Sequence, residues 1–240
     1  MGRCAVVTVG GRGIGAAIVD RLRIDGYRVM PLDLYESDGV TICDVAAPAA
    51  VEAAADSSGA TDLLVNNAAI WLFAALEDVT EADFGLALDV NLKGAFHCVQ
   101  SFGRLMLEQG SGTIVNIVPI AAKHANPAVG SYGPSKAALL SLTEQIALEW
   151  APQGIRGDAV GPGLVPTPGT GTVYDDPQVQ AVRPGAVPLR RLAQPTDIAN
   201  VVSFLASDDA AYVNGQVIYV DGGVSKGLMT LLPRPPEVPQ

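Results

Sequence analysis

The chain has 240 residues, 49% of them hydrophobic, and a formal net charge of −10 at pH 7. A chain of this length can bury one large core. The acidic balance and the lack of any long basic run argue against double-stranded nucleic acid as a partner, so we expect the charge to serve solubility.

Cysteine and histidine are scarce. Cys4, Cys43 and Cys98 are far apart and form no CxxC pair, and only two histidines are present. This composition favours a reducing compartment and predicts neither a disulfide framework nor a metal site. The apolar start is too short for a signal peptide, and no apolar stretch approaches the roughly 18 residues of a membrane span. We therefore expect a cytoplasmic protein without membrane attachment.

Short apolar runs alternate with segments of helical periodicity along the chain. The alternation predicts right-handed βαβ units and an α/β fold with a doubly wound, parallel, Rossmann-like sheet in a single domain, residues 1–223. The strands expected are residues 4–9, 28–33, 40–43, 63–66, 113–118, 155–160 and 216–220. The helices expected are residues 13–25, 84–109, 132–150 and 196–205.

Two segments have the composition of irregular structure. Residues 162–188 are rich in Pro, Gly and Thr and predict a long loop, which at that length is usually a functional lid or disordered. Residues 232–240 hold four prolines, so we expect residues 224–240 to form a C-terminal Pro-rich tail.

A glycine-rich segment, GGRGIG at residues 10–15, joins the first strand to the first helix. Glycines there let the backbone approach a pyrophosphate, whose charge the helix N-terminus stabilises. Asp33 ends the second strand, where a carboxylate accepts hydrogen bonds from the ribose of NAD and repels a 2′-phosphate. Residues 34–36 add no Lys or Arg. An ordinary glycine turn beside a surface aspartate is the weaker interpretation, because strand, loop, helix and acid follow in order.

Tyr132 and Lys136 lie four residues apart at the start of a predicted helix, so they share one face. A neighbouring ammonium lowers the pKa of a phenol, because it favours the phenolate. A tyrosine tuned in this way can exchange a proton with an alcohol oxygen. Taken alone, so short a pattern is better explained as a surface pair without a role.

Together these motifs resemble the short-chain dehydrogenase/reductase family of the single-domain kind. The resemblance covers nearly all of residues 4–223. Besides the segments above, it rests on Asp44-Val45, NNAA at residues 66–69, Asn91 in DVNLKG, Pro162-Gly163 followed by Thr167, and YVDGG at residues 219–223.

The resemblance implies an NAD-dependent oxidoreductase that interconverts a secondary alcohol and a ketone by hydride transfer. Tyr132 would be the general acid/base, Lys136 would hold the nicotinamide ribose, and Asn91 would position a water in a proton relay. It also implies a homo-oligomer, a dimer or tetramer, that pairs through the two long helices. The cofactor-binding residues it implies are Arg12, Gly13, Ile14, Asp33, Asp44, Val45, Asn67, Tyr132, Lys136, Val165 and Thr167.

One departure from the family pattern concerns catalysis. The family has a serine at the end of the fifth strand that donates a hydrogen bond to the substrate oxygen, whereas Val118 and Pro119 stand here. Losing one such donor typically lowers the rate by about 10²–10³. His124, on the loop that follows, is a candidate replacement, although a partly exposed loop histidine is the better interpretation.

Two further departures concern the cofactor site. Val9 replaces the first glycine of the loop, and a β-branched residue is strongly disfavoured if that site needs a positive φ. Gly10 and Gly11 could instead adopt the turn conformation one residue later. Gly157-Asp158 and Gly161 replace larger or amide side chains of the family, which predicts a looser floor below the cofactor.

The substrate pocket is less defined by sequence. Trp71 and Phe73 are candidate walls, as are residues 125–130 and the loop of residues 166–188, but core packing or an oligomer contact explains both aromatics equally well. Two alternatives to the oxidoreductase stay open: a catalytically silent NAD-binding or assembly subunit, and non-redox chemistry such as elimination.

Overall fold

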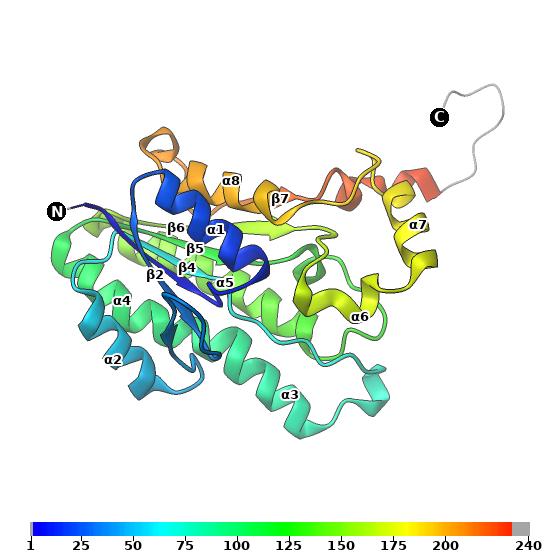
Figure 1. The fold of residues 1–240 in the computed structure, drawn as a ribbon, viewed down its shortest axis with the longest axis horizontal. Coiled ribbons are helices and arrows are strands. Elements are labelled where there is room, and N and C mark those ends of the chain that lie inside the picture. The colour runs from blue at the N-terminus through cyan, green and yellow to red at the C-terminus, as the bar shows by residue number, and fades with distance from the viewer. Residues whose placement is uncertain (1, 232–240) are drawn as a thin grey trace.

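Seven parallel strands form one sheet, as the alternating pattern predicts (Figure 1). The computed structural model describes residues 2–231. The strand order is β3-β2-β1-β4-β5-β6-β7, and every neighbouring pair is parallel. The strands are β1 (Cys4–Thr8), β2 (Arg28–Asp33), β3 (Thr41–Ile42), β4 (Leu63–Asn66), β5 (Gly112–Ile117), β6 (Ile155–Pro162) and β7 (Val217–Val220).

Helices cover both faces of the sheet, which buries apolar side chains on each (Figure 1). Helices α1 and α8 pack on one face through residues such as Ile18 and Ile198, and α2, α4 and α5 cover the other through Val51, Phe102 and Ile146. The helices are α1 (Gly13–Ile24), α2 (Pro48–Ser58), α3 (Glu81–Leu88), α4 (Ala95–Gln109), α5 (Tyr132–Trp150), α6 (Gly171–Tyr174), α7 (Pro177–Ala186) and α8 (Pro195–Leu205).

The helix expected over residues 84–109 differs in its start and its continuity. It begins three residues earlier, at Glu81, because the Thr80 hydroxyl accepts a hydrogen bond from the backbone N–H of Asp83 at 3.0 Å. A π-helical turn, Asp89–Gly94, separates α3 from α4. Helix α2 was not predicted, because its alanine-rich sequence shows no clear apolar stripe.

The loop expected over residues 162–188 is wrong in most of its length. A 3-10 turn (Pro168–Thr170), α6 and α7 fill it. The Asp176 carboxylate caps α7 by accepting from the N–H of Gln178 at 2.7 Å, and Pro177 occupies the first turn, where its missing N–H costs nothing. The helix start signal, Asp176 followed by Pro177, was not recognised because the composition of the segment is typical of a loop.

The end of the chain is described only in part. Val224–Leu231, the first part of the predicted tail, forms a 3-10 helix, and residues 232–240 lie outside the described residues. Within residues 2–231, no helix combines the length and apolarity needed to cross a membrane.

The predicted loosening of the cofactor floor is wrong, because neighbouring side chains occupy the space at both glycines. A Cβ added to Gly161 would lie 2.5 Å from the Tyr219 ring, and one added to Gly157 would lie 2.8 Å from Cγ2 of Ile146. The Asp158 carboxylate accepts a hydrogen bond from the Gln216 N–H at 2.9 Å and pairs with Arg156.

The glycine loop turns at Val9 itself. Val9 has φ 52°, in the left-handed region, whereas Gly10 and Gly11 do not have positive φ. The suggestion that these two glycines take the turn is therefore wrong. The carbonyl of Val9 passes so close to α1 that a Cβ on Gly15 would lie 1.9 Å from it. The loop keeps a tight geometry, and Val9 carries strain of about 1–3 kcal/mol.

Replacing Val9 tests this strain. Val9→Gly should raise the free energy of unfolding by about 1 kcal/mol net, because glycine adopts a left-handed conformation without steric cost but loses more chain entropy on folding. Urea denaturation measures the change. Val9→Ala is the matched control: it retains a Cβ at positive φ and should give a smaller gain or none. Equal stabilities of the two variants would contradict the strain.

Candidate active site

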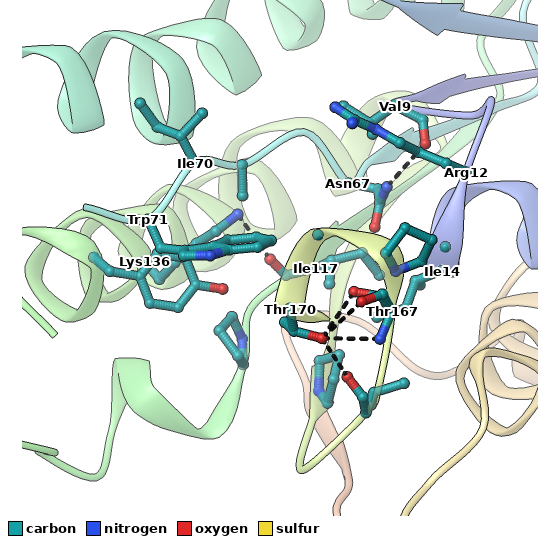
Figure 2. A pocket seen from close by; sticks show the side chains of 18 of the residues that line it. Val9, Arg12, Ile14, Asn67, Ile70, Trp71, Ile117, Lys136, Thr167 and Thr170 are labelled. Atoms are coloured by element: carbon teal, nitrogen blue, oxygen red, sulfur yellow. Dashed lines mark hydrogen bonds between the residues drawn. The ribbon is translucent and has the colours of Figure 1, made fainter. Parts of the chain in front are cut away.

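A cavity of about 500 Å³ lies at the carboxyl ends of the central strands (Figure 2). The order in which strands are added to the sheet reverses between β1 and β4, and ligands of doubly wound sheets bind at such a switch point. Six segments contribute walls: the glycine loop, the segment after β4, α3 through Leu86, the end of β5, the start of α5 and the segment after β6. Of the predicted site residues, Arg12, Gly13, Ile14, Asn67, Tyr132, Lys136, Val165 and Thr167 line it.

The glycine-loop end of the cavity fits a pyrophosphate. Helix α1 begins at Gly13, its N-cap residue Arg12 provides no side-chain cap, and its first turn holds no acidic residue. The first N–H groups of the helix are therefore available to an anion. Thr167 lies directly over this turn, since a Cβ on Gly13 would lie 3.3 Å from the Cβ of Thr167.

The residues expected to bind the adenosine do not line this cavity. Asp33 is buried, and its Oδ1 accepts hydrogen bonds from the N–H groups of Leu34 and Tyr35 at 2.8 and 3.4 Å. Asp44 is exposed and accepts from the N–H of Ala46 at 2.9 Å, while Val45 is buried. The cofactor contacts of Asp33, Asp44 and Val45 stay predictions.

Tyr132 and Lys136 both reach the cavity from the first turns of α5. The Lys136 ammonium is buried and donates a hydrogen bond to the carbonyl of Ile117 at 3.1 Å (Figure 2). Burial lowers the pKa of Lys136 to about 7. Burial also raises the pKa of the Tyr132 hydroxyl above its ordinary value. The direction for Tyr132 is opposite to the one predicted, because burial desolvates the phenolate.

Asn91 is buried in the π-helical turn and its side chain is fully engaged. Its Oδ1 accepts from the N–H of Ile70 at 2.7 Å, and its Nδ2 donates to the Ile70 carbonyl at 2.8 Å and to Ser135 Oγ at 2.9 Å. Asn91 is not among the cavity-lining residues, so its water relay stays a prediction. What the structure shows is that Asn91 fixes the segment after β4 against α5.

Only some of the residues predicted to form pocket walls line the cavity. Trp71 lines the cavity and makes an edge-to-face contact with Tyr132, with ring centroids 6.1 Å apart and an interplanar angle of 80°. Phe73 is 55% exposed and is absent from the lining. Pro119 lines the cavity and offers no donor. His124 is exposed beside the ring of Tyr219 rather than in the lining, so it does not replace a donor.

Part of the loop predicted as a wall, residues 166–188, does line the cavity, through Thr167, Pro168, Gly169 and Thr170. The Thr170 hydroxyl accepts a hydrogen bond from the N–H of Thr167 at 2.8 Å and holds this segment over the cavity. Ile70, Leu72 and Leu86 also line the cavity and were not predicted, because no motif marks them.

Burial of Lys136 predicts a pH-dependent stability. Its pKa is about 7 in the folded protein against an ordinary 10.5, so between these values the unfolded chain binds the additional proton. Stability contributed by this group therefore rises with pH above about 7 and is lost as pH falls to 7. Lys136→Met should flatten this rise. Urea denaturation at about pH 7, 8 and 9 measures both proteins, and parallel curves would contradict the prediction.

Comparisons with known proteins identify the family of this chain. The family profile described as enoyl-(acyl carrier protein) reductase matches residues 9–225. The chain is 35% identical over 244 aligned residues to 3-oxoacyl-[acyl-carrier-protein] reductase of Staphylococcus epidermidis, covering 93% of this chain and 99% of that protein. It is also 35% identical to 3-alpha-(or 20-beta)-hydroxysteroid dehydrogenase of Mycobacterium bovis, covering 95% and 91% of the two chains.

Among solved structures, a gluconate 5-dehydrogenase from Burkholderia cenocepacia in complex with NADP and tartrate superposes with a TM-score of 0.89 at 31% identity, covering 93% of this chain and 95% of that one. Sequence and structure agree over nearly the whole chain. The protein therefore belongs to the short-chain dehydrogenase/reductase family of NAD(P)-dependent oxidoreductases.

Proposed function

We propose that the protein interconverts a secondary alcohol and a ketone with NAD as its preferred cofactor and Tyr132 as general acid/base. One observation carries the proposal: the Tyr132 hydroxyl, the Lys136 ammonium and an uncapped helix N-terminus behind the glycine loop face a single cavity. A phenol and an anion-binding turn in one crevice suit proton exchange beside a bound dinucleotide.

The protonated form of Tyr132 suits the role of proton donor. When bound, the reduced cofactor supplies the hydride that adds to the carbonyl carbon of the substrate. Because burial raises the pKa of Tyr132, its hydroxyl is protonated near neutral pH and can donate to the substrate oxygen as that oxygen gains negative charge. This protonated form is the one that ketone reduction requires.

Asp33 supports NAD over NADP. Its Oδ1 is held by two backbone N–H groups, which fixes a negative charge at the end of β2. Such a charge repels a 2′-phosphate. Arg12 acts in the opposite sense: its guanidinium stacks on Tyr35, 4.9 Å from the ring centroid, next to the same turn. We give Asp33 the greater weight because it is buried, whereas Arg12 is exposed.

The proposal includes a small neutral substrate, a homo-oligomer and a cytoplasmic location. Apart from Arg12 and Lys136, no charged side chain lines the cavity within the described residues, which favours an uncharged substrate. Phe96 on α4 and Leu148 on α5 are 41% and 80% exposed, which supports pairing through the long helices. Three free, buried cysteines are compatible with a reducing compartment.

Tyr132→Phe tests the proposed acid/base. Its kcat for cyclohexanone with NADH should fall by about 10²–10⁴, because only the proton donor is lost, while NADH binding persists. NADH absorbance and thermal melting with cofactor measure the two quantities. Tyr212→Phe is the matched control, since Tyr212 is fully exposed and outside the cavity.

The same assay separates the alternatives. A wild type that reduces no ketone in a panel of cyclic, aryl and alkyl ketones, with either NADH or NADPH and without cofactor-induced stabilisation, would support the silent subunit. Product formation without consumption of NADH would support non-redox chemistry.

Asp33→Asn tests cofactor choice. Asparagine keeps one oxygen for the N–H groups of Leu34 and Tyr35 but removes the charge. The ratio of kcat/KM with NADPH to that with NADH should rise by about tenfold or more, because like-charge repulsion costs several kcal/mol. Glu36→Gln, an exposed acid in the same turn, is the control and should leave the ratio unchanged. A ratio unaffected by Asp33→Asn would contradict the assignment.

A further inference from the structure

The cavity beside Tyr132 is poor in free side-chain donors. Lys136 donates to the Ile117 carbonyl at 3.1 Å, and Asn67 Nδ2 donates to the Thr8 carbonyl at 3.0 Å. The hydroxyls of Thr167 and Thr170 lie 3.2 Å apart and bond to each other. Arg12 belongs to the glycine loop and stacks on Tyr35. The donors of Asn67 and of the two threonines are occupied and Arg12 belongs to the phosphate end, whereas Lys136 is anchored to Ile117 and keeps further N–H groups.

The indole of Trp71 is the exception. Trp71 lines the cavity, and Figure 2 shows its ring pointing into it from the segment after β4. Within residues 2–231 its indole N–H makes no hydrogen bond. Indole nitrogen is a donor only, so this N–H is available to an acceptor that enters the cavity.

Three contacts hold the indole in place. Its edge-to-face contact with Tyr132 puts the ring centroids 6.1 Å apart. Its benzene edge lies against Gly169, where an added Cβ would be 2.9 Å from Cη2 and 3.0 Å from Cζ2. Ile70, the preceding residue, is fixed by the side-chain amide of Asn91, whose oxygen accepts from the Ile70 N–H and whose nitrogen donates to the Ile70 carbonyl. A donor held by packing and by hydrogen bonds is preorganised, which is what stabilisation of a developing charge requires.

The other side of Tyr132 offers no such donor. Pro119 lines the cavity and has no N–H, and the N–H of Val118 is bonded to the Val160 carbonyl at 2.9 Å. During reduction the substrate oxygen gains charge before it is fully protonated, so a second donor lowers the barrier. Trp71 is the residue placed to supply it.

We propose that Trp71 is a catalytic residue whose indole N–H hydrogen-bonds the substrate oxygen together with the Tyr132 hydroxyl. The inference rests on the proposed function. As the hydride adds to the carbonyl carbon, the π-electron pair moves to oxygen, the O–H bond of Tyr132 breaks and its proton joins that oxygen. The N–H bond of Trp71 stays intact throughout.

A serine introduced at position 119, on the opposite wall of the cavity, tests whether Trp71 acts as a hydrogen-bond donor. Trp71→Phe keeps an aromatic wall but removes the N–H, and Pro119→Ser adds a hydroxyl. Serine suits position 119, which has φ −63° and ψ 164° and precedes a 3-10 turn. With cyclohexanone and NADH, Trp71→Phe should lower kcat by about 10² with little change in NADH affinity. Adding Pro119→Ser should restore about tenfold, whereas Pro119→Ser alone should gain less than about threefold.

Leu72→Ala is the matched control, because Leu72 lines the same cavity without a polar group. It should raise KM and should not be rescued by Pro119→Ser. A Trp71→Phe protein that keeps kcat within about threefold of wild type overturns the inference, as does an equal gain from Pro119→Ser in both backgrounds. Wild-type silence with NADH and NADPH would instead overturn the proposed function and the inference with it.

A second variant covers the case in which Trp71→Phe does not fold. Gly169→Ala keeps the indole N–H but displaces the ring, because the new methyl group occupies its contact. It should lower kcat by about tenfold while thermal melting still shows stabilisation by NADH. An unchanged kcat in this variant would also overturn the inference.

Discussion

A small hydrogen-bonded clamp between the ends of β1 and β4 organises the site. The Thr8 hydroxyl accepts from the N–H groups of Asn67 and Ala68 at 2.9 and 2.8 Å, and Asn67 Nδ2 returns a bond to the Thr8 carbonyl at 3.0 Å. Parallel neighbours bring the two strand ends together, and the clamp then fixes the loops that leave them. The glycine loop departs on one side and the segment that carries Trp71 on the other, so their relative position is set where the cavity begins.

Beyond the clamp, burial determines the ionisation states of Tyr132 and Lys136. In the protein alone, desolvation keeps Tyr132 neutral and lowers the pKa of Lys136 to about 7. The lysine is therefore not a fixed positive charge near neutral pH, and its effect on the phenol depends on what fills the cavity. A neutral tyrosine beside a titrating lysine suits the role of proton donor. Helical spacing identified the pair, but it gave the wrong direction for the pKa of Tyr132 because spacing carries no information on burial.

Local patterns predicted the architecture well, because parallel strands buried on both faces appear as short apolar runs. They failed for residues 162–188, where the capping contact of Asp176 outweighs a loop-like composition. Tyr132 and Lys136 are brought together by one helix, so sequence alone was enough. Trp71 and Gly169 meet only because different crossovers end at the same edge of the sheet, and Asn91 reaches Ile70 and Ser135 through a π-helical turn. No single-sequence pattern encodes such long-range contacts.

Val9 and Pro119 have different physical consequences. At Val9 the backbone keeps the left-handed conformation and the close approach to Gly15, so the valine adds strain without reshaping the turn. At Pro119 the backbone is relaxed, but a donor is absent from one wall of the cavity. Strain at a site that still has its shape affects stability, whereas a missing donor affects the reaction unless another group supplies it. Trp71, held by Tyr132 and Gly169 and free to donate, is placed where such a group is needed.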